Sequence, residues 1–176
     1  MKALKRIIIG TILVFSIGVV VFLGLSLYAY DNLKYYSVYY AQQMPHKEGT
    51  EPDLVMLIEN MWWIYTPEIE GIRYDDDGRN FIENSTNLTG KPTNFDELIG
   101  GYGYSDQNDV TYKFNKNFSL EWAIDKDYKK IDLTTIDEKK IKQGIRETVQ
   151  PVLDVQSKPL INLQWLFNKM YQDRFN

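Results

Sequence analysis

The sequence predicts an α+β protein: an N-terminal transmembrane helix followed by a small antiparallel β-sheet domain packed with helices. Two observations carry this prediction. Residues 7–30 contain no charged side chain, and a helix needs roughly 20 apolar residues to cross a membrane core of about 30 Å. Further along, apolar and polar residues alternate in short runs between turn sequences, and apolar residues at helical spacing return in residues 135–176. Alternation is typical of half-buried strands, and spacing of three or four residues is typical of helices.

The charges around the apolar segment predict its orientation. Lys2, Lys5 and Arg6 precede it, and basic residues mark the side of a membrane helix that stays in the cytoplasm. We therefore expect residues 1–6 to form a cytoplasmic basic tail and residues 7–30 to form a signal anchor in the inner (cytoplasmic) membrane. Residues 31–176 then lie in the periplasm. The lipid bilayer is an expected partner of the chain through residues 7–30.

Residues at both ends of this segment are expected at the membrane interfaces. Lys5 and Arg6 suit the inner interface, and Tyr28 and Tyr30 suit the outer one, where an aromatic ring can be apolar while its hydroxyl is wet. A cleaved signal peptide, cut after Ala29, is the alternative. Signal peptides have apolar cores of about 7–15 residues, so the longer run favours a retained anchor.

Composition limits the partners of the outer part. Three of the 20 basic residues and none of the 24 acidic residues lie in the first thirty positions, which leaves an excess of seven acids beyond them. This excess argues against nucleic acid as a partner and would suit a basic protein. The chain also has no cysteine. Small domains secreted by eukaryotes usually carry disulfides, so this absence points to a bacterial envelope.

Residues 31–49 are expected to form a helical extension and linker, and residues 50–176 the periplasmic α+β domain. Tyr36 and Tyr40 in the extension are four apart, which predicts packing onto the domain or an exposed tyrosine surface for a partner. A helix is expected from Thr50 to Tyr65. We expect its adjacent tryptophans, Trp62 and Trp63, to be buried, with an exposed Trp63 as the alternative.

Two β-hairpins are expected in the domain. Residues 69–74 and 79–83 flank an acidic turn of three aspartates and a glycine. Residues 110–114 and 118–124 alternate around a second turn, with Trp122 on the buried face. We expect a third strand at 128–133.

The segment between the hairpins is expected to contain a short helix at 95–99 and a mobile aromatic loop at 100–104. Two helices are expected at the end of the chain. One runs from a capping box at Thr135 to Pro151, and the other begins near Pro159. The last helix is expected to bury an apolar stripe, formed by Leu163, Leu166, Phe167, Met170 and Tyr171.

No catalytic signature is present. The only histidine, His46, lies in the expected linker, and a nucleophile without a neighbouring base is not activated. No spacing of metal ligands appears, and the acidic turn lacks the acids that an EF-hand needs at positions occupied by Arg73 and Asn84. We therefore predict no enzyme, no cofactor and no metal. A carboxylate-based cell-wall hydrolase is the remaining catalytic alternative, using Glu59, Glu83, Asp109 or Glu121.

These observations predict a membrane-anchored periplasmic binding protein. Its architecture resembles the single-pass immunity proteins that guard against secreted antibacterial effectors, which implies that it neutralises an envelope-acting toxin. The alternative is an accessory subunit of a bacterial secretion, division or transport complex. The candidate partner-binding residues are acidic or aromatic and lie in expected turns and loops: Asp75, Asp76, Asp77, Tyr102, Tyr104 and Trp63.

Overall fold

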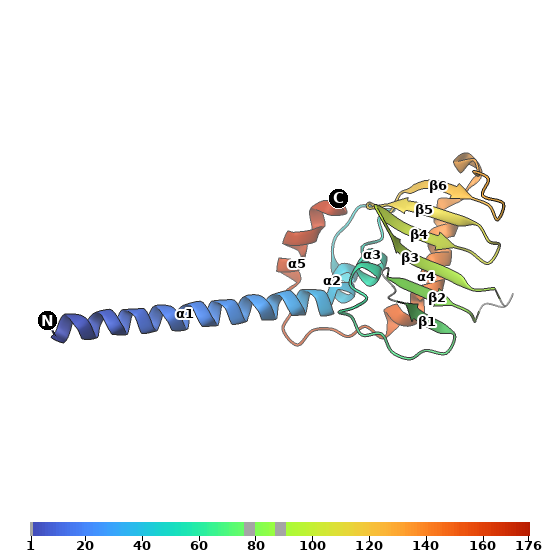
Figure 1. Ribbon diagram of the computed structural model, residues 1–176. Helices are drawn as coiled ribbons and strands as arrows, with labels where there is room; N and C mark the ends of the chain where they lie inside the picture. Colours follow the sequence, from blue (N-terminus) through green and yellow to red (C-terminus); the bar gives the residue numbers. More distant parts are fainter. Residues whose placement is uncertain (1, 76–79, 87–90) are drawn as a thin grey trace.

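The computed structural model describes residues 2–75, 80–86 and 91–176 of the chain. It consists of one long N-terminal helix and a domain in which helices accompany a six-stranded antiparallel sheet (Figure 1). The predicted α+β class and the long apolar N-terminal helix are therefore confirmed.

The helices are α1 (Lys2–Tyr35), α2 (Ser37–Gln43), α3 (Pro52–Glu59), α4 (Glu138–Asp154) and α5 (Gln164–Tyr171), with short 3₁₀ helices η1 (Leu133–Thr135) and η2 (Gln172–Arg174). The strands are β1 (Ile72–Asp75), β2 (Phe81–Asn84), β3 (Thr93–Leu98), β4 (Gly101–Ser105), β5 (Thr111–Asn115) and β6 (Leu120–Ile124).

Helix α1 projects away from the domain (Figure 1). Within its segment Ile8–Tyr35, the most apolar stretch of 18 residues has a mean hydropathy of 2.7, and the domain does not cover that stretch. By length and composition the helix is able to cross a membrane. The helix continues past residue 30, as predicted, until the chain bends at Tyr36 and enters α2.

The six strands follow one another in the sheet in chain order, and each pairs with the next in antiparallel fashion. The two predicted hairpins are thus confirmed as β1–β2 and β5–β6. The prediction of a third strand at 128–133 is wrong, because only Lys130 in that segment makes a bridge, to Ile124.

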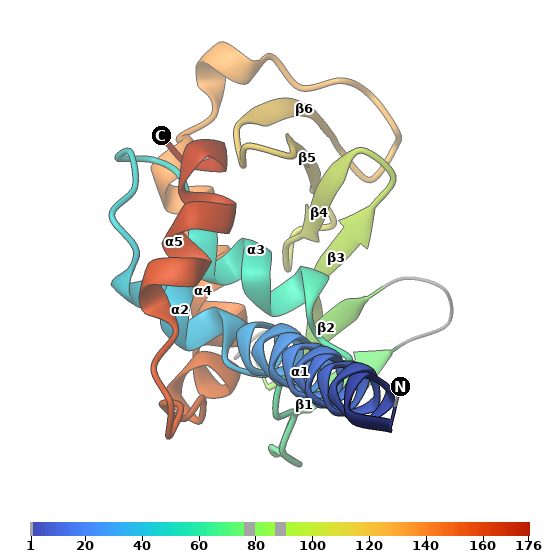
Figure 2. The ribbon, with the colours of Figure 1, turned by 90° about the vertical axis from the view of Figure 1, so that its left-hand side faces the viewer.

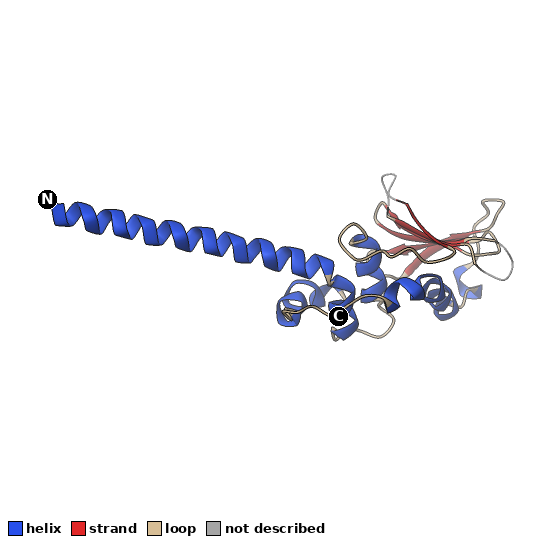
Figure 3. Cartoon of the chain, turned by 90° about the horizontal axis from the view of Figure 1, so that it is seen from below, coloured by secondary structure: helices blue, strands red, loops and turns tan. Residues whose placement is uncertain are grey.

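One face of the sheet, the inner face, forms the core with the helices. Its central row is made of register partners from all six strands, namely Tyr74, Ile82, Phe95, Tyr104, Tyr112 and Ala123. Helix α4 contacts β2 and β3, and α3 contacts β3. The helices lie on this side of the sheet (Figure 3).

The predicted extension contributes to this core. Tyr40 of α2 is fully buried and its ring stacks on Phe167 of α5, with the ring centroids 5.4 Å apart. Met44, which follows α2, is also buried. The packing predicted for the tyrosines of residues 31–49 is therefore confirmed for Tyr40.

The short helix predicted at 95–99 is wrong, because residues 95–98 belong to β3. Two of its side chains depart from the usual alternation of apolar residues facing the core with polar residues facing away. Glu97 points to the inner face although it is charged, and there it accepts a hydrogen bond from Asn80 Nδ2 at 2.8 Å. Leu98 points to the other face although it is apolar, and it covers Gly103.

Strand β6 differs from the prediction in the face that it buries. Its pairing with β5 shifts between Lys113 and Phe114, which leaves Glu121 as an extra residue. A bulge of this kind reverses which side chains face inward beyond it. Ala123 is consequently buried, while Trp122 is 38% exposed on the opposite face.

The helix boundaries also differ. Helix α3 ends at Glu59, and both tryptophans beyond it, Trp62 and Trp63, are exposed rather than buried. Helix α4 begins after Asp137, whose carboxylate accepts hydrogen bonds from two backbone N–H groups, so the capping box predicted at Thr135 is wrong. The helix also continues through Pro151.

The apolar stripe predicted for the last helix is confirmed only in part. Helix α5 begins at Gln164 rather than near Pro159. Phe167 is fully buried, but Met170 is exposed.

Candidate functional site

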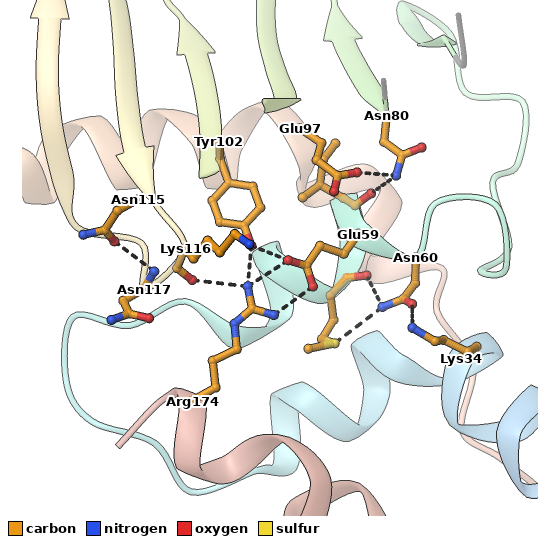
Figure 4. Close-up of polar contacts among 12 residues, drawn as sticks. Lys34, Glu59, Asn60, Asn80, Glu97, Tyr102, Asn115, Lys116, Asn117 and Arg174 are labelled. Carbon is orange, nitrogen blue, oxygen red and sulfur yellow. Dashed lines mark hydrogen bonds and ion pairs between the residues drawn. The ribbon is translucent and has the colours of Figure 1, made fainter. Parts of the chain in front are cut away.

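A polar cluster in the described domain joins α3, the sheet and the C-terminal segment (Figure 4). Arg174 donates from Nη1 to Glu59 Oε2 at 2.9 Å and from Nη2 to Glu59 Oε1 at 2.8 Å. The same Nη2 donates to the Tyr102 hydroxyl at 2.6 Å, and that hydroxyl donates to Glu59 Oε1 at 2.6 Å. We call Glu59, Tyr102 and Arg174 the C-terminal clasp.

The electrostatics of the clasp follow from partial burial. Burial by itself raises the pKa of Glu59, but hydrogen bonds from Arg174 and Tyr102 outweigh it, and the net pKa is lowered. Burial and the neighbouring Glu59 carboxylate raise the pKa of Tyr102 far above its usual range. Nearby, burial and the charge of Glu59 raise the pKa of Glu97, against the opposing hydrogen bond from Asn80.

The clasp has the properties of a structural contact. Both oxygens of Glu59 are held by the guanidinium of Arg174, and Tyr102 stays protonated at neutral pH. A general acid or base needs a pKa near the working pH, and neither Glu59 nor Tyr102 meets this condition. The arrangement instead fastens the C-terminal segment to α3 and β4.

Two predicted contact residues lie inside the domain. Tyr102 and Tyr104 are 1% and 4% exposed on the inner face of β4, so the prediction of an exposed aromatic loop at 100–104 is wrong. The physical reason is the period-two order of glycine and tyrosine. Gly101 and Gly103 face the other side, where an added Cβ at Gly101 would stand 2.0 Å from the Phe114 carbonyl oxygen. The tyrosines therefore face the core.

The other predicted contacts have different positions. Asp75 is half-buried at the end of β1, and Asp76 and Asp77 lie outside the described residues. Trp63 is 43% exposed and meets Tyr30 of α1 edge-on, with ring centroids 5.7 Å apart. The structure thus brings together a predicted partner contact and a predicted membrane-interface residue.

The remaining predicted interface residues all belong to α1. Tyr28 and Arg6 are exposed on it, and the side chain of Lys5 lies outside the described part of the chain.

The carboxylates of the hydrolase alternative do not share a site. Glu59 belongs to the clasp, Glu83 pairs with Arg73 at 2.8 Å, and Asp109 pairs with Lys91 at 2.9 Å. Each of the three is thus held by a different cation in a different part of the domain. Within residues 2–75, 80–86 and 91–176, no group of three or more His, Asp or Glu side chains is arranged to hold a metal ion.

The face of the sheet opposite the helices was not predicted as a site. Phe81, Asp96, Gly103, Lys113 and Trp122 are successive register partners from β2 to β6, so they form one row across this face. Asp75 extends the row to β1. We call Phe81, Asp96, Leu98, Lys113 and Trp122 the outer sheet face.

The centre of the outer sheet face is closed by two side chains that cross β4. Leu98 Cδ1 lies 2.7 Å from the position of a Cβ at Gly103, and Lys113 Nζ lies 2.5 Å from that of a Cβ at Gly101. Lys113 is almost fully buried, and its Nζ donates to the Phe114 carbonyl oxygen at 3.1 Å. Burial lowers the pKa of Lys113, and the charge of Glu121 opposes this effect. The result is a closely packed surface with aromatic rings on either side of a charged centre.

No protein-family model matches this chain, and no curated protein or solved structure matches it. Function is therefore inferred from the placement of its own side chains.

Proposed function

We propose that this chain is a membrane-anchored binding protein that displays its domain on the periplasmic side of a bacterial inner membrane and captures another protein without catalysis. The observation that carries the proposal is helix α1, whose segment Ile8–Tyr35 contains an apolar stretch of 18 residues that the domain does not bury. A helix that is apolar on all sides needs an apolar surrounding. A bilayer supplies this surrounding along roughly 20 residues.

The orientation rests on charge. Lys2, Lys5 and Arg6 precede the apolar segment, and the first acidic residue of the chain, Asp31, follows it. Basic residues close to a membrane helix favour the cytoplasmic side. The domain, which begins immediately after α1, is then on the opposite side of the membrane.

The outer sheet face is the surface best suited to a protein partner. Trp122 and Phe81 stand on either side of Lys113 and Asp96, which Gly103 separates in the row, and the described helices lie on the other side of the sheet (Figure 3). Aromatic residues are enriched in protein interfaces, and Trp is a frequent binding hot spot.

The acidic excess beyond residue 30 favours a basic partner. Within this reading, the most specific form is an immunity protein that neutralises a secreted toxin acting in the envelope.

Capture of a partner by the full chain in detergent micelles tests the proposal. Envelope extract and purified secreted toxins are each passed over the immobilised protein, and Trp122→Ser is compared with Trp165→Ser, which alters an exposed tryptophan elsewhere. We expect a stoichiometric partner that is lost with Trp122→Ser and retained with Trp165→Ser. Failure to capture any protein, or capture by both Trp122→Ser and Phe81→Ser that equals capture by the natural chain, would contradict the proposal.

A second function, an accessory subunit of a membrane complex, is favoured by the same uncovered helix, because its exposed side chains can also pack against helices of other proteins. Exchange of residues 7–30 for an unrelated spanning helix separates the two functions. A tethered binding protein keeps its activity after the exchange, whereas a subunit that assembles through its anchor loses it.

A further inference from the structure

Exposed apolar side chains gather where α1 joins the domain. They come from three segments that are distant in the sequence: the residues after α3, the connection between α4 and α5, and α5 itself. All six are between 43% and 100% exposed. They are Trp62, Trp63, Leu160, Ile161, Trp165 and Met170, which we call the membrane-facing collar.

Direct contacts with α1 and α2 fix the height of the collar. Trp63 meets the Tyr30 ring edge-on, with centroids 5.7 Å apart. Asn32 Nδ2 and the Tyr40 hydroxyl each donate to the Ile161 carbonyl oxygen at 3.3 Å. Both segments that carry these collar residues are therefore held at the level of residues 30–32 of α1.

That level coincides with the expected edge of the hydrocarbon. An α-helix rises about 1.5 Å per residue, so a core of about 30 Å takes up roughly the 20 residues that follow Ile7 and ends near Leu27. Tyr28, Tyr30 and Asn32 then lie in the polar interfacial layer. Trp63 and Ile161 lie in the same layer, because they contact Tyr30 and Asn32.

The shape of the domain agrees with this placement. Helix α5 and the connection that precedes it form the side of the domain nearest to the N-terminal end of α1 (Figure 1). In the view along α1, the same two segments are in front of the sheet (Figure 2). The two segments that carry Leu160, Ile161, Trp165 and Met170 are therefore on the side of the domain that faces the N-terminal end of α1.

The chemistry of the collar fits a bilayer interface. Trp and Tyr are enriched at this layer, where an apolar ring and a polar group are both satisfied. Lys158 and Lys169 are exposed on the same two segments as Leu160, Ile161, Trp165 and Met170, and they suit lipid phosphates. Asp31, Asp154 and Asp173 are exposed acids nearby in the sequence.

We propose that the collar is a second membrane contact, inserted into the interfacial layer of lipid, which holds the domain in one orientation on the bilayer. This inference rests on the proposed anchoring of the chain through α1. The collar side chains leave 43% to 100% of their surface exposed in the described chain, and the lipid layer at the level of Tyr30 and Asn32 is able to cover them.

Lipid quenching of single tryptophans tests the proposal in the full chain. The chain has four tryptophans, and three of them are replaced by Phe to leave only Trp165, only Trp62 or only Trp122. The last is a matched control, since it is exposed on β6, which lies away from α1 and α5 (Figure 1). Each variant is reconstituted in phosphatidylcholine vesicles in which part of the lipid carries bromine on the upper acyl chain.

We expect several-fold stronger bromine quenching of Trp165 and Trp62 than of Trp122. Quenching of Trp165 that is no greater than that of Trp122 would overturn the proposal that the collar contacts lipid. Shielding of Trp165 from iodide without bromine quenching would also overturn it, because another protein copy would then cover this face.

Flotation of the vesicles separates this result from failure of the anchor. If the protein does not float with lipid, both the anchor and the collar are wrong. If it floats but its collar tryptophans are not quenched, only the collar is wrong. Loss of partner capture in the preceding experiment would leave the quenching result unchanged.

Discussion

Two aromatic surfaces of this molecule, the inner sheet face and the membrane-facing collar, contain similar residues but differ in burial. On the inner face, Phe114 is fully buried and its ring stacks on Phe118 at 4.9 Å. In the collar, Trp62 and Trp165 leave about two thirds of their surface uncovered. The difference lies in what stands opposite each surface. Helices and the C-terminal clasp close the inner face, whereas the collar has no such cover in the described chain and needs the bilayer.

The largest effect on stability is expected from a substitution in the buried inner sheet face. Phe114→Ala removes a fully buried ring, and such changes cost about 3–5 kcal/mol because they also leave a cavity. Trp165→Ala, made in the collar, is expected to change the free energy of unfolding by less than about 0.5 kcal/mol in detergent. Chemical denaturation of both full-length variants measures the contrast. Equal losses in the two variants would show that the collar is part of the folded core.

A smaller effect is expected at the edge of the buried surface. Arg174→Met leaves Glu59 and Tyr102 without their shared donor, and loss of hydrogen bonds to a partly buried charge costs about 1–3 kcal/mol. The matched control is Arg73→Met, which breaks a pair whose arginine is largely exposed and is expected to cost at most about 1 kcal/mol. A loss in Arg174→Met no larger than in the control would mean that the clasp adds little to stability.

The clasp also predicts a dependence on pH. The folded-state pKa of Glu59 is lowered below its usual value of 4.5, so its contribution is present above that value and is lost as the pH falls through the folded pKa. Acid should therefore destabilise the natural chain more steeply than Glu59→Gln. Thermal melting between neutral and acidic pH checks this, and parallel curves for the two proteins would contradict it.

The smallest effect is expected at Glu97. Burial and the neighbouring Glu59 raise its pKa, so the ionised form weakens the folded state as the pH rises through the folded pKa, and the neutral form does not. Glu97→Gln should therefore raise the melting temperature slightly at neutral pH, with the gain vanishing in acid. A lower melting temperature at neutral pH would mean that the charged hydrogen bond from Asn80 outweighs the cost of burial.

The parts of the fold that the sequence predicts well depend on local patterns. The apolar run of α1 and the alternation in β1, β2 and β5 needed no distant partner to be recognised. The same holds for the packing of Tyr40, which follows from its spacing of four residues from Tyr36.

The errors arise where a distant residue decides the outcome. Glu97 faces inward because Asn80, which lies before β2, hydrogen bonds to it, and this partner hides the alternation of β3. Helix α4 continues past Pro151 because Val152 and Leu153 are buried in the core. Burial of two such side chains at about 1.5–3 kcal/mol each offsets the roughly 3 kcal/mol cost of an internal proline.

In the candidate sites, too, some features follow from a local sequence pattern and others depend on distant residues. The alternation of Gly101 and Gly103 with Tyr102 and Tyr104 was a period-two signal for a buried strand, visible in the sequence but outweighed by the loop-like composition. The outer sheet face, by contrast, is assembled by register from residues of four strands, β2, β3, β5 and β6. The bulge that turns Trp122 outward has no sequence signal of its own.

The most direct test of the central claim, a domain anchored outside the membrane by α1, is the sidedness of the two ends. Because the chain has no cysteine, the variants Lys126→Cys, in an exposed turn after β6, and Lys2→Cys each carry one reactive thiol. A membrane-impermeant maleimide should label Lys126→Cys in intact spheroplasts and Lys2→Cys only after the membrane is permeabilised. Labelling in the reverse pattern, or recovery of either protein in the soluble fraction, would contradict the account.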